Sequence, residues 1–590
     1  MIQPGLERIS QLVKNVTFPW KSIHVAGTNG KGSVCHFASM LLSKRLKCGK
    51  FTSPHLVDRW DCISINNKPV EEALFRKIEK HYIDLNMRKG INASNFEILT
   101  ATAFHIFNEE QVQVGVVEVG MGGKLDATNI LNNQVISLIS KIARDHESFL
   151  GSTLQEIAHH KAGILRPHVP YLINPKNEKN VISVINEYAD EIAAGPRLEY
   201  DPPGFSKALF HNKDWLPAQP VHQENMIIAA MAAKTVMESF GREYTTWDMA
   251  RILRKSRLEN PGRLESVQVP PIFGQRATMS SRAFKGESIL VDGAHNPDAA
   301  RVLSQHVQKF QRRKKIPNEG RVPRNGWPVT WVLAMTEGKD AHKYLREILQ
   351  PGDNVVTTTF GPVDGMPWVK PMDPSRLLDM AKSVEPGIMG LVASEGGPLR
   401  ALCTAKYLRD PDRPIVLTGS LYLVGDVHRE RRLRPNKVYW EDPKFEDDRN
   451  KIAAMLEEEK HRVNWLLSDT DTFGLTTDSF DELNRKSGIW RKQLAEREKQ
   501  RTIREEIAAL DEKVKSLTEE EKLLGLEQPS AITEITRLTT LENARSVQRI
   551  NGNTGRTGFQ EKNSYLDSEH EDTDEDFRLE RNRGPPHRKK

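Results

Sequence analysis

The residues best suited to chemistry form a glycine-rich loop near the amino terminus. Residues 24–33 read His-Val-Ala-Gly-Thr-Asn-Gly-Lys-Gly-Ser, and they join a short apolar stretch to a predicted helix. Backbone N–H groups in such a loop, together with the positive end of the helix, bind phosphate, and Lys31 can reach the outer phosphates of a nucleotide. The predicted phosphate-binding residues are Gly27, Thr28, Asn29, Gly30, Lys31, Gly32 and Ser33.

The loop departs from the common Walker A pattern on both sides of the lysine. Val25 stands where that pattern has its first glycine, and Gly32 follows Lys31 where serine or threonine is usual. On this pattern alone, a glycine-rich turn that binds no nucleotide stays an alternative.

Short motifs follow the loop along the chain, and most of them have a chemical role. Together with the loop they resemble the folylpolyglutamate synthase and dihydrofolate synthase family, within the Mur ligase superfamily, over residues 1 to about 430. The resemblance implies an ATP-dependent ligase. The motifs lie at residues 52–56, 118–129, 145–151, 160–164, 261–263, 292–297 and 419–422.

A carboxylate follows one of the apolar stretches. Glu118 comes after residues 114–117, and α/β sheets bind ligands at the carboxyl ends of their strands. Phosphoryl transfer uses Mg²⁺, which prefers oxygen ligands. The resemblance implies that Ser53, Glu118 and His146 bind Mg²⁺, with Ser33 close by. Without the resemblance, Glu118 would more often be a helix cap or ion-pair partner, and His146 a surface or core residue.

Lys161 resembles the lysine that members of the superfamily carry as a carbamate. Carbamylation requires a neutral amine, and therefore a desolvated site that lowers the pKa of the lysine. A lysine on a helix surface is the alternative interpretation of this residue.

The resemblance places the other nucleotide contacts beyond residue 220. Asp292 would bind the ribose, His295 would lie near the phosphates or the adenine, and Arg263 would reach the transferred phosphate. The adenine-side motif is shortened to His-Gln-Glu-Asn at residues 222–225, which leaves open which amide acts. The predicted catalytic residues are Lys31, His146, Lys161 and Arg263. The other predicted nucleotide contacts are Asn225, Arg263, Asp292 and His295.

Short apolar strands alternate with helical stretches, which predicts an α/β fold. Expected strands include 23–26 and 114–117 in a first sheet, and 288–291, 329–333 and 415–417 in a second. Expected helices include 34–46 and 96–107. We therefore expect a Mur-ligase-like architecture, in which a P-loop-type ATPase domain with a mostly parallel sheet precedes a smaller Rossmann-like domain. The interdomain junction is expected at 261–285, and the basic stretch 311–324 as solvated surface in preference to an anion site.

Beyond about residue 430 the chain becomes highly charged. Apolar residues at 503, 507, 510, 514 and 517 follow heptad spacing, and Ser479 with Glu482 resembles a capping box. This tail would self-associate, bind a partner or be a dispensable extension. The predicted domains are 1–270 (ATP-binding), 285–430 (carboxy-terminal Mur-ligase-like), 431–540 (charged helical extension) and 541–590 (disordered tail).

Composition argues against several classes of function. A net charge of +6, from 85 basic and 79 acidic residues, is too small for a nucleic-acid-binding surface. The sequence shows neither a membrane-spanning apolar run nor a signal peptide, and the strand and loop start too early for a mitochondrial presequence. We expect a cytoplasmic protein that binds neither nucleic acid nor membrane. The four cysteines form no CxxC pair and are expected to be free thiols.

The implied reaction joins L-glutamate to a substrate carboxylate through an acyl phosphate made from ATP. Residues 122–129 and 59–63 are more similar to fungal dihydrofolate synthases, so dihydropteroate is the expected acceptor. A folylpolyglutamate synthase or bifunctional enzyme that uses reduced folate is the alternative, and an inactive scaffold acting through its tail is another. Cys62 stands where the family commonly has arginine, which weakens any transfer of pterin-side contacts. We expect small-molecule substrates and a monomeric core.

Overall fold

The computed structural model describes most of the chain up to residue 463. The described ranges are 5–211, 220–256, 260–269, 287–315, 322–393, 397–408, 413–433 and 454–463. The predicted capping box at Ser479, the heptad pattern of 503–517 and the predicted domain 541–590 lie outside these ranges. The predicted extents of the tail domains therefore stay predictions.

The first sheet has seven strands in the order β4-β3-β2-β5-β1-β6-β7. The strands from β2 to β7 in this order are parallel, whereas β3 and β4 are antiparallel. The expected strands at 23–26 and 114–117 and the mostly parallel sheet are confirmed. The strand bounds are β1 Lys21–Ala26, β2 Cys48–Phe51, β3 Ile63–Ile65, β4 Lys68–Pro69, β5 Val114–Glu118, β6 Gln134–Ile139 and β7 Tyr171–Ile173.

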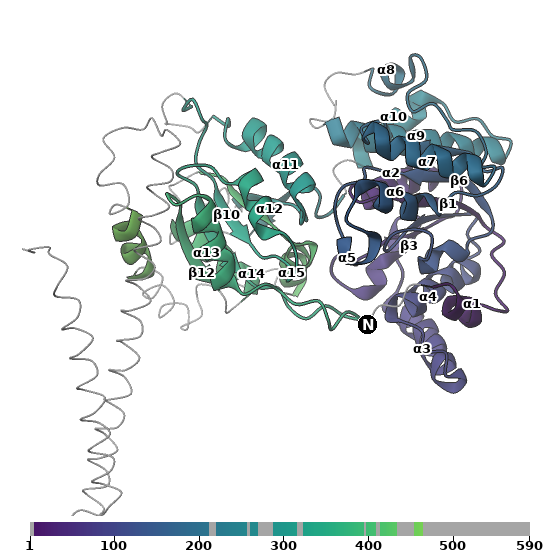
Figure 1. Ribbon diagram of the computed structural model, residues 1–590, viewed down its shortest axis with the longest axis horizontal. Helices are drawn as coiled ribbons and strands as arrows, with labels where there is room; N and C mark the ends of the chain where they lie inside the picture. Colours follow the sequence, from purple (N-terminus) through teal and green to yellow (C-terminus); the bar gives the residue numbers. More distant parts are fainter. Residues whose placement is uncertain are drawn as a thin grey trace, which may run out of the picture. The chain divides into compact units, whose positions relative to one another are not determined.

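Helices cover both faces of the first sheet (Figure 1). One hydrophobic core joins the sheet to α2, α9 and α10, and another joins it to α1, α3 and α4. The expected helices are confirmed in kind, although α2 starts three residues earlier than 34, because Gly30 caps it. The bounds are α1 Glu7–Leu12, α2 Lys31–Leu42, η1 Arg59–Cys62, α3 Glu72–Lys89, α4 Asn95–Glu109, η2 Ala127–Ile130, α5 Glu147–Leu150, α6 Leu154–Ala162, α7 Lys179–Glu191, α8 Phe205–Leu209, α9 Pro220–Ser239 and α10 Thr246–Ser256.

The second sheet has six strands in the order β12-β11-β10-β13-β9-β8. All pairs are parallel except β8 with β9, which is antiparallel. The sheet starts with β8 at Glu265, which lies inside the expected junction 261–285. The antiparallel β8 lies at the edge, where it can pair on one side only. The strand bounds are β8 Glu265–Val269, β9 Glu287–Val291, β10 Thr330–Leu333, β11 Asn354–Thr358, β12 Met389–Ala393 and β13 Ile415–Thr418.

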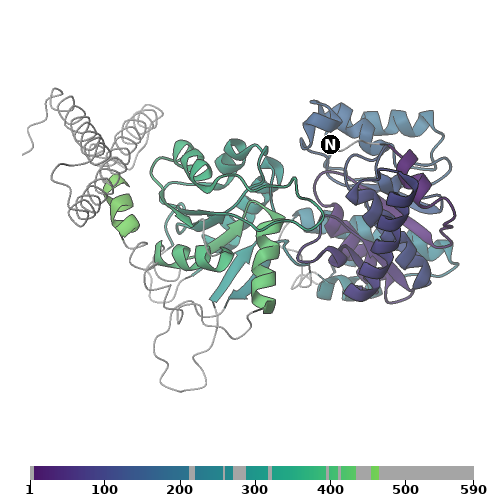
Figure 2. The same cartoon turned by 90° about the horizontal axis from the view of Figure 1, so that it is seen from below.

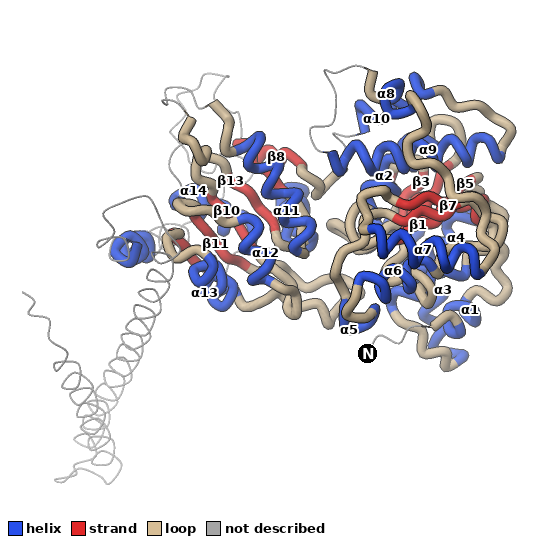
Figure 3. Tube along the Cα trace, turned by 45° about the horizontal axis from the view of Figure 1, so that its top comes forward, coloured by secondary structure: helices blue, strands red, loops and turns tan. Residues whose placement is uncertain are grey.

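Helices also cover both faces of the second sheet (Figures 2 and 3). One core contains α14 and α15, and the other contains α11, α12 and α13. Within the described ranges, no helix is long and apolar enough to span a lipid bilayer. The four cysteines are buried free thiols, as expected. The bounds are α11 Pro297–His306, η5 Val307–Gln311, α12 Ala341–Ile348, α13 Pro374–Val384, α14 Gly397–Leu408 and α15 Leu421–Leu433.

The expectation of a solvated basic stretch at 311–324 is wrong for Arg312. Its guanidinium binds both carboxylate oxygens of Asp353, at 2.6 and 2.5 Å, and both residues are almost fully buried. The same carboxylate accepts hydrogen bonds from the Val329 N–H and the Trp331 indole, each at 2.9 Å. A buried ion pair with additional hydrogen bonds ties the end of α11 and η5 to β10 and β11.

We call the second sheet and the helices that cover it the second lobe. We predict that Arg312→Ala lowers the free energy of unfolding of this lobe by about 3 to 5 kcal/mol, because it leaves the buried carboxylate of Asp353 without the cation that faces it. Arg313→Ala is the matched control, since Arg313 is exposed, and its effect should stay within about 0.5 kcal/mol. Chemical denaturation of both variants measures the difference. Equal effects of the two substitutions would contradict a structural role for the Arg312 and Asp353 pair.

Candidate functional site

The phosphate loop connects β1 to α2 and requires glycine at two positions. Gly27 has a φ of +147°, and a Cβ there would lie 1.9 Å from the Ser140 hydroxyl oxygen. Gly30 has a φ of +88°, and a Cβ there would lie 2.7 Å from the side-chain oxygen of Asn225. Only glycine combines these backbone angles with such close neighbours.

The residues that follow β6 hold the loop in place. The N–H groups of Thr28 and Asn29 both donate to the Lys141 carbonyl, at 2.8 and 3.0 Å. The Ser140 hydroxyl donates to the Asn29 carbonyl at 2.9 Å. The backbone donors that remain for phosphate are therefore those at the start of α2, which have no acceptor within the helix.

Lys31, Glu118 and Ser53 come together beside the loop, as the sequence predicts for an ATP-dependent site. The Lys31 amine lies 3.7 Å from one oxygen of Glu118, and the Ser53 N–H donates to the other at 3.3 Å. Burial raises the pKa of Glu118, while the positive charges of Lys31 and Arg263 oppose this rise. The site thus has a buried carboxylate directly beside a lysine.

The donor atoms near Glu118 fit Mg²⁺ bound partly by its substrate. Mg²⁺ is commonly held by one or two carboxylates together with phosphate oxygens and water. Within the described ranges, no group of three or more His, Cys, Asp or Glu side chains could hold a metal ion. Gly32 leaves the Glu118 carboxylate open, since a Cβ there would lie 3.4 Å from its oxygen. Glu118 would therefore hold the ion with Ser33 and Ser53 nearby.

His146 lies beside Asp145, and no contact between His146 and Glu118 is found. Its side chain is 47% exposed, and its Nε2 lies 3.9 Å from a carboxylate oxygen of Asp145. Desolvation of the covered part of the ring, together with the positive charges of nearby lysines such as Lys339, lowers the pKa of His146, so the imidazole is neutral near pH 7. The structure thus brings together Ser53 and Glu118 of the three predicted metal ligands.

Asp145 and Lys339 are site residues that the sequence reasoning did not select. The Lys339 amine donates to Asp145 at 2.5 Å, and Nε2 of His295 lies 3.4 Å from the same carboxylate. Burial alone would raise the pKa of Asp145, but the hydrogen bond from His295 and the charges of His146 and Lys339 hold it well below its ordinary value. The only sequence signal for Lys339 is its place in a polar turn after β10.

Lys161 is buried, which excludes the alternative of a lysine on a helix surface. It lies in the last turn of α6, and its amine donates to the Gly27 carbonyl at 2.8 Å. Burial, reinforced by the nearby charge of Lys31, lowers the pKa of Lys161 to about 7. A neutral amine against the phosphate loop meets the requirement for carbamylation.

The predicted second-lobe residues form a turn between β9 and α11. The buried carboxylate of Asp292 accepts hydrogen bonds from the N–H groups of Leu264 and Ala294, each at 2.8 Å. Nδ1 of His295 lies 3.1 Å from the Gly293 carbonyl oxygen, and Arg263 lies against Gly293, where a Cβ would be 2.6 Å from its guanidinium. Asp292, His295 and Arg263 therefore surround the same turn.

Asn29 connects the phosphate loop to the start of α11. Its amide donates to Asp298 at 2.8 Å, and its oxygen accepts from the Asn296 amide at 3.0 Å. Asn296 is also the cap of α11, since its oxygen accepts from the Ala299 N–H. A rearrangement of the loop would therefore disturb the hydrogen bonds at the start of this helix.

Asn225 is the amide of the shortened motif that touches the phosphate loop. It is 3% exposed on α9, and its side chain packs against Gly30. The neighbouring Glu224 instead accepts a hydrogen bond from Asn174 at 3.4 Å. The structure therefore places the Asn225 amide directly against the nucleotide loop.

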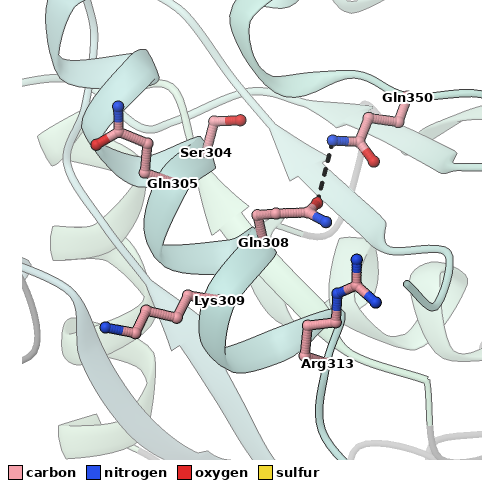
Figure 4. A pocket seen from close by; sticks show the side chains of 6 residues that line it. All are labelled: Ser304, Gln305, Gln308, Lys309, Arg313 and Gln350. Carbon is pink, nitrogen blue, oxygen red and sulfur yellow. Dashed lines mark hydrogen bonds between the residues drawn. The ribbon is translucent and has the colours of Figure 1, made fainter. Parts of the chain in front are cut away.

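A cavity of about 460 Å³ on the second lobe contains none of the predicted site residues. Figure 4 shows its lining side chains on α11, η5, the turn after η5 and the segment after α12, with Gln350 donating to Gln308 at 3.2 Å. It has no carboxylate and no glycine-rich loop. The candidate site is therefore defined by the loop and its charges, and not by this cavity. The cavity is lined by Ser304, Gln305, Gln308, Lys309, Arg313 and Gln350.

We predict that Gly30→Ala weakens ATP binding by about tenfold or more, because the added Cβ meets Asn225 at a left-handed position. Adding Asn225→Ala should restore part of the affinity by removing the clash. Gly204→Ala is the matched control, since Gly204 caps α8 with a φ of +81° and has open space around its Cβ position. Calorimetric titration with ATP measures all three; an unchanged affinity in Gly30→Ala would contradict the assigned loop.

Comparison with known proteins supports the same assignment. Residues 275–430 match the family model for the dihydrofolate synthetase C-terminal domain. The chain is 35% identical to the probable dihydrofolate synthetase of Schizosaccharomyces pombe, over 73% of this chain and 99% of that protein. It is 36% identical to the dihydrofolate synthetase of Saccharomyces cerevisiae, over 72% of this chain and 98% of that protein.

A solved structure agrees with the described fold. The Mycobacterium tuberculosis folylpolyglutamate synthase, complexed with ADP and AMPPCP, is 26% identical and superposes with a TM-score of 0.57. The similarity covers 74% of this chain and 96% of that one. The two-sheet α/β architecture is thereby confirmed. The similarities to the two dihydrofolate synthetases show the family, and the phosphate loop and the buried Glu118 agree with it: the chain belongs to the folylpolyglutamate synthase and dihydrofolate synthase family.

Proposed function

We propose that this protein is a dihydrofolate synthase that uses ATP to join L-glutamate to 7,8-dihydropteroate. The γ-phosphoryl group of ATP is transferred to the carboxylate of dihydropteroate, which gives an acyl phosphate and ADP. The amine of glutamate then attacks the acyl carbon, the phosphate leaves, and an amide bond forms. The observation that carries this proposal is the meeting of Lys31, Glu118 and Ser53 at the start of α2.

The side chains of the site mainly position ATP and balance its charge, which is what phosphoryl transfer demands. The start of α2 supplies backbone donors, and Lys31 supplies a positive charge beside Glu118. Mg²⁺, when bound, would neutralise part of the phosphate charge. Arg263 lies against the turn that carries His295 and its charge acts on Glu118, which supports a role for it in stabilising the transferred phosphate.

Dihydropteroate is favoured over reduced folate as the acceptor. The relatives named dihydrofolate synthetase are 35% and 36% identical to this chain, whereas the folylpolyglutamate synthase structure is 26% identical. Cys62, in the position where the family commonly has arginine, is 1% exposed and packs in a hydrophobic core. Burial raises the pKa of the Cys62 thiol, so this position offers no charge to either acceptor, and the choice of acceptor rests on the similarities.

We expect glutamate-dependent ADP release to have a higher kcat/KM with dihydropteroate than with tetrahydrofolate.

Lys31→Ala and Glu118→Ala should each lower kcat by about 100-fold or more, because charge stabilisation at the phosphates is lost. Lys343→Ala is the control, since Lys343 is exposed on α12 and pairs with Asp340. Near-normal turnover in either site variant would contradict the mechanism, and a preference for tetrahydrofolate would contradict only the acceptor.

We also predict that Lys161 takes up ¹³C-labelled CO₂ as a carbamate. Its pKa of about 7 means that the neutral amine becomes the main form as the pH rises through 7, so the ¹³C NMR signal should grow over that range. Lys161→Arg should abolish the signal, because a guanidinium stays protonated. Lys343→Arg should leave it unchanged, and a signal that survives in Lys161→Arg would contradict the assignment.

A further inference from the structure

A short helix at residues 454–463 packs against the second lobe, after the end of the family-model match at residue 430. It is drawn in light green at the left of Figure 1. Glu459 and Arg462 are 5% and 1% exposed, respectively, and Leu456 packs against the hydrophobic core that contains α14 and α15. Charged residues are rarely buried this deeply unless they have specific partners.

The partners of Glu459 lie on β12 and α13. One carboxylate oxygen accepts the N–H of Gly390 at 3.1 Å and the Nε of Arg462 at 2.8 Å. The other accepts the Lys382 amine at 3.0 Å. Burial lowers the pKa of Lys382, and the facing carboxylate favours its charged form. The helix therefore provides a carboxylate that accepts hydrogen bonds from a backbone N–H of β12 and from the buried Lys382.

Arg462 contacts the backbone of the segment that leads into β12, at residues 386 and 388. Its Nη1 donates to the Pro386 carbonyl at 3.1 Å, and its Nη2 donates to the Ile388 carbonyl. Residues 388 and 390 are two apart, so in an extended strand their backbone groups face the same side. The Glu459 and Arg462 pair thus accepts from one N–H of β12 and donates to two carbonyls of the segment that leads into this strand.

β12 is the edge strand of the second sheet, next to β11. An edge strand has backbone donors and acceptors on its outer side, which another chain can use to add a strand. Glu459 and Arg462 thus occupy backbone groups at and just before this edge that a neighbouring strand could otherwise use.

We propose that the helix 454–463 is an intramolecular cap of the β12 edge, which prevents a second chain from pairing with the second lobe through this strand. The proposal does not depend on which substrate accepts glutamate or on the mechanism of ligation. It gives the first part of the tail a structural role. A truncation near residue 435 would remove this cap, whereas a chain that ends after residue 463 would keep it.

The test uses full-length variants Glu459→Ala and Arg462→Ala. Both should lower the unfolding temperature by about 5 °C or more and produce higher-mass species in light scattering after size exclusion. Lys460→Ala is the matched control, because Lys460 lies on the same helix, is exposed and pairs with Glu457. It should leave mass and unfolding temperature unchanged.

Hydrogen exchange keeps the test decisive if a variant folds poorly. In the wild-type chain, the peptide that spans residues 386–393 should be protected, and Arg462→Ala should accelerate its exchange at least tenfold while peptides from β1 and β5 stay unchanged. Unchanged exchange and mass in both variants would overturn the proposal. A wild-type dimer that dissociates in Arg462→Ala would also overturn it, since the helix would then cap the edge of a second copy.

Discussion

The buried carboxylate of Glu118 is the constraint on which the site depends. A charge in this position is costly unless cations and donors face it, and Lys31 and the Ser53 N–H do so from separate elements. The Lys31 contact requires that α2 starts directly after the loop, which in turn requires the left-handed Gly30 cap, whereas Ser53 is positioned by the end of β2. The strand order β2-β5-β1 places the segments that follow these three strands at one edge of the sheet, which brings these groups together.

Lys161 extends this arrangement to a third element. Its amine holds the Gly27 carbonyl, and its low pKa results from burial beside the cation of Lys31. An ordinary lysine here would add a second positive charge next to the phosphate loop. A neutral or carbamylated lysine avoids this repulsion, which explains why such a residue can be tolerated so close to Lys31.

Much of the fold and part of the site could be predicted from the sequence, for identifiable reasons. Strands such as β1 and β5 are apolar because parallel strands are buried on both faces, and Glu118 follows such a strand directly. Lys339 and Arg312 could not be selected in this way, because their partners Asp145 and Asp353 lie 194 and 41 residues away in the chain. The same holds for Glu459, whose partners become apparent only when β12 is seen to be an edge strand.

Asn29 and Asp145 form hydrogen bonds with residues that follow strands of the second sheet. Asn29 lies in the phosphate loop yet bonds to Asn296 and Asp298, and Asp145 bonds to Lys339. These bonds join the residues nearest the expected phosphates to the elements that carry His295. A ligand that reorients Asn29 would have to break these hydrogen bonds, so nucleotide binding would be coupled to the contacts between the loop and the start of α11. The linkage arises from polar side chains at the start of α11, so it can change without any alteration of the hydrophobic cores.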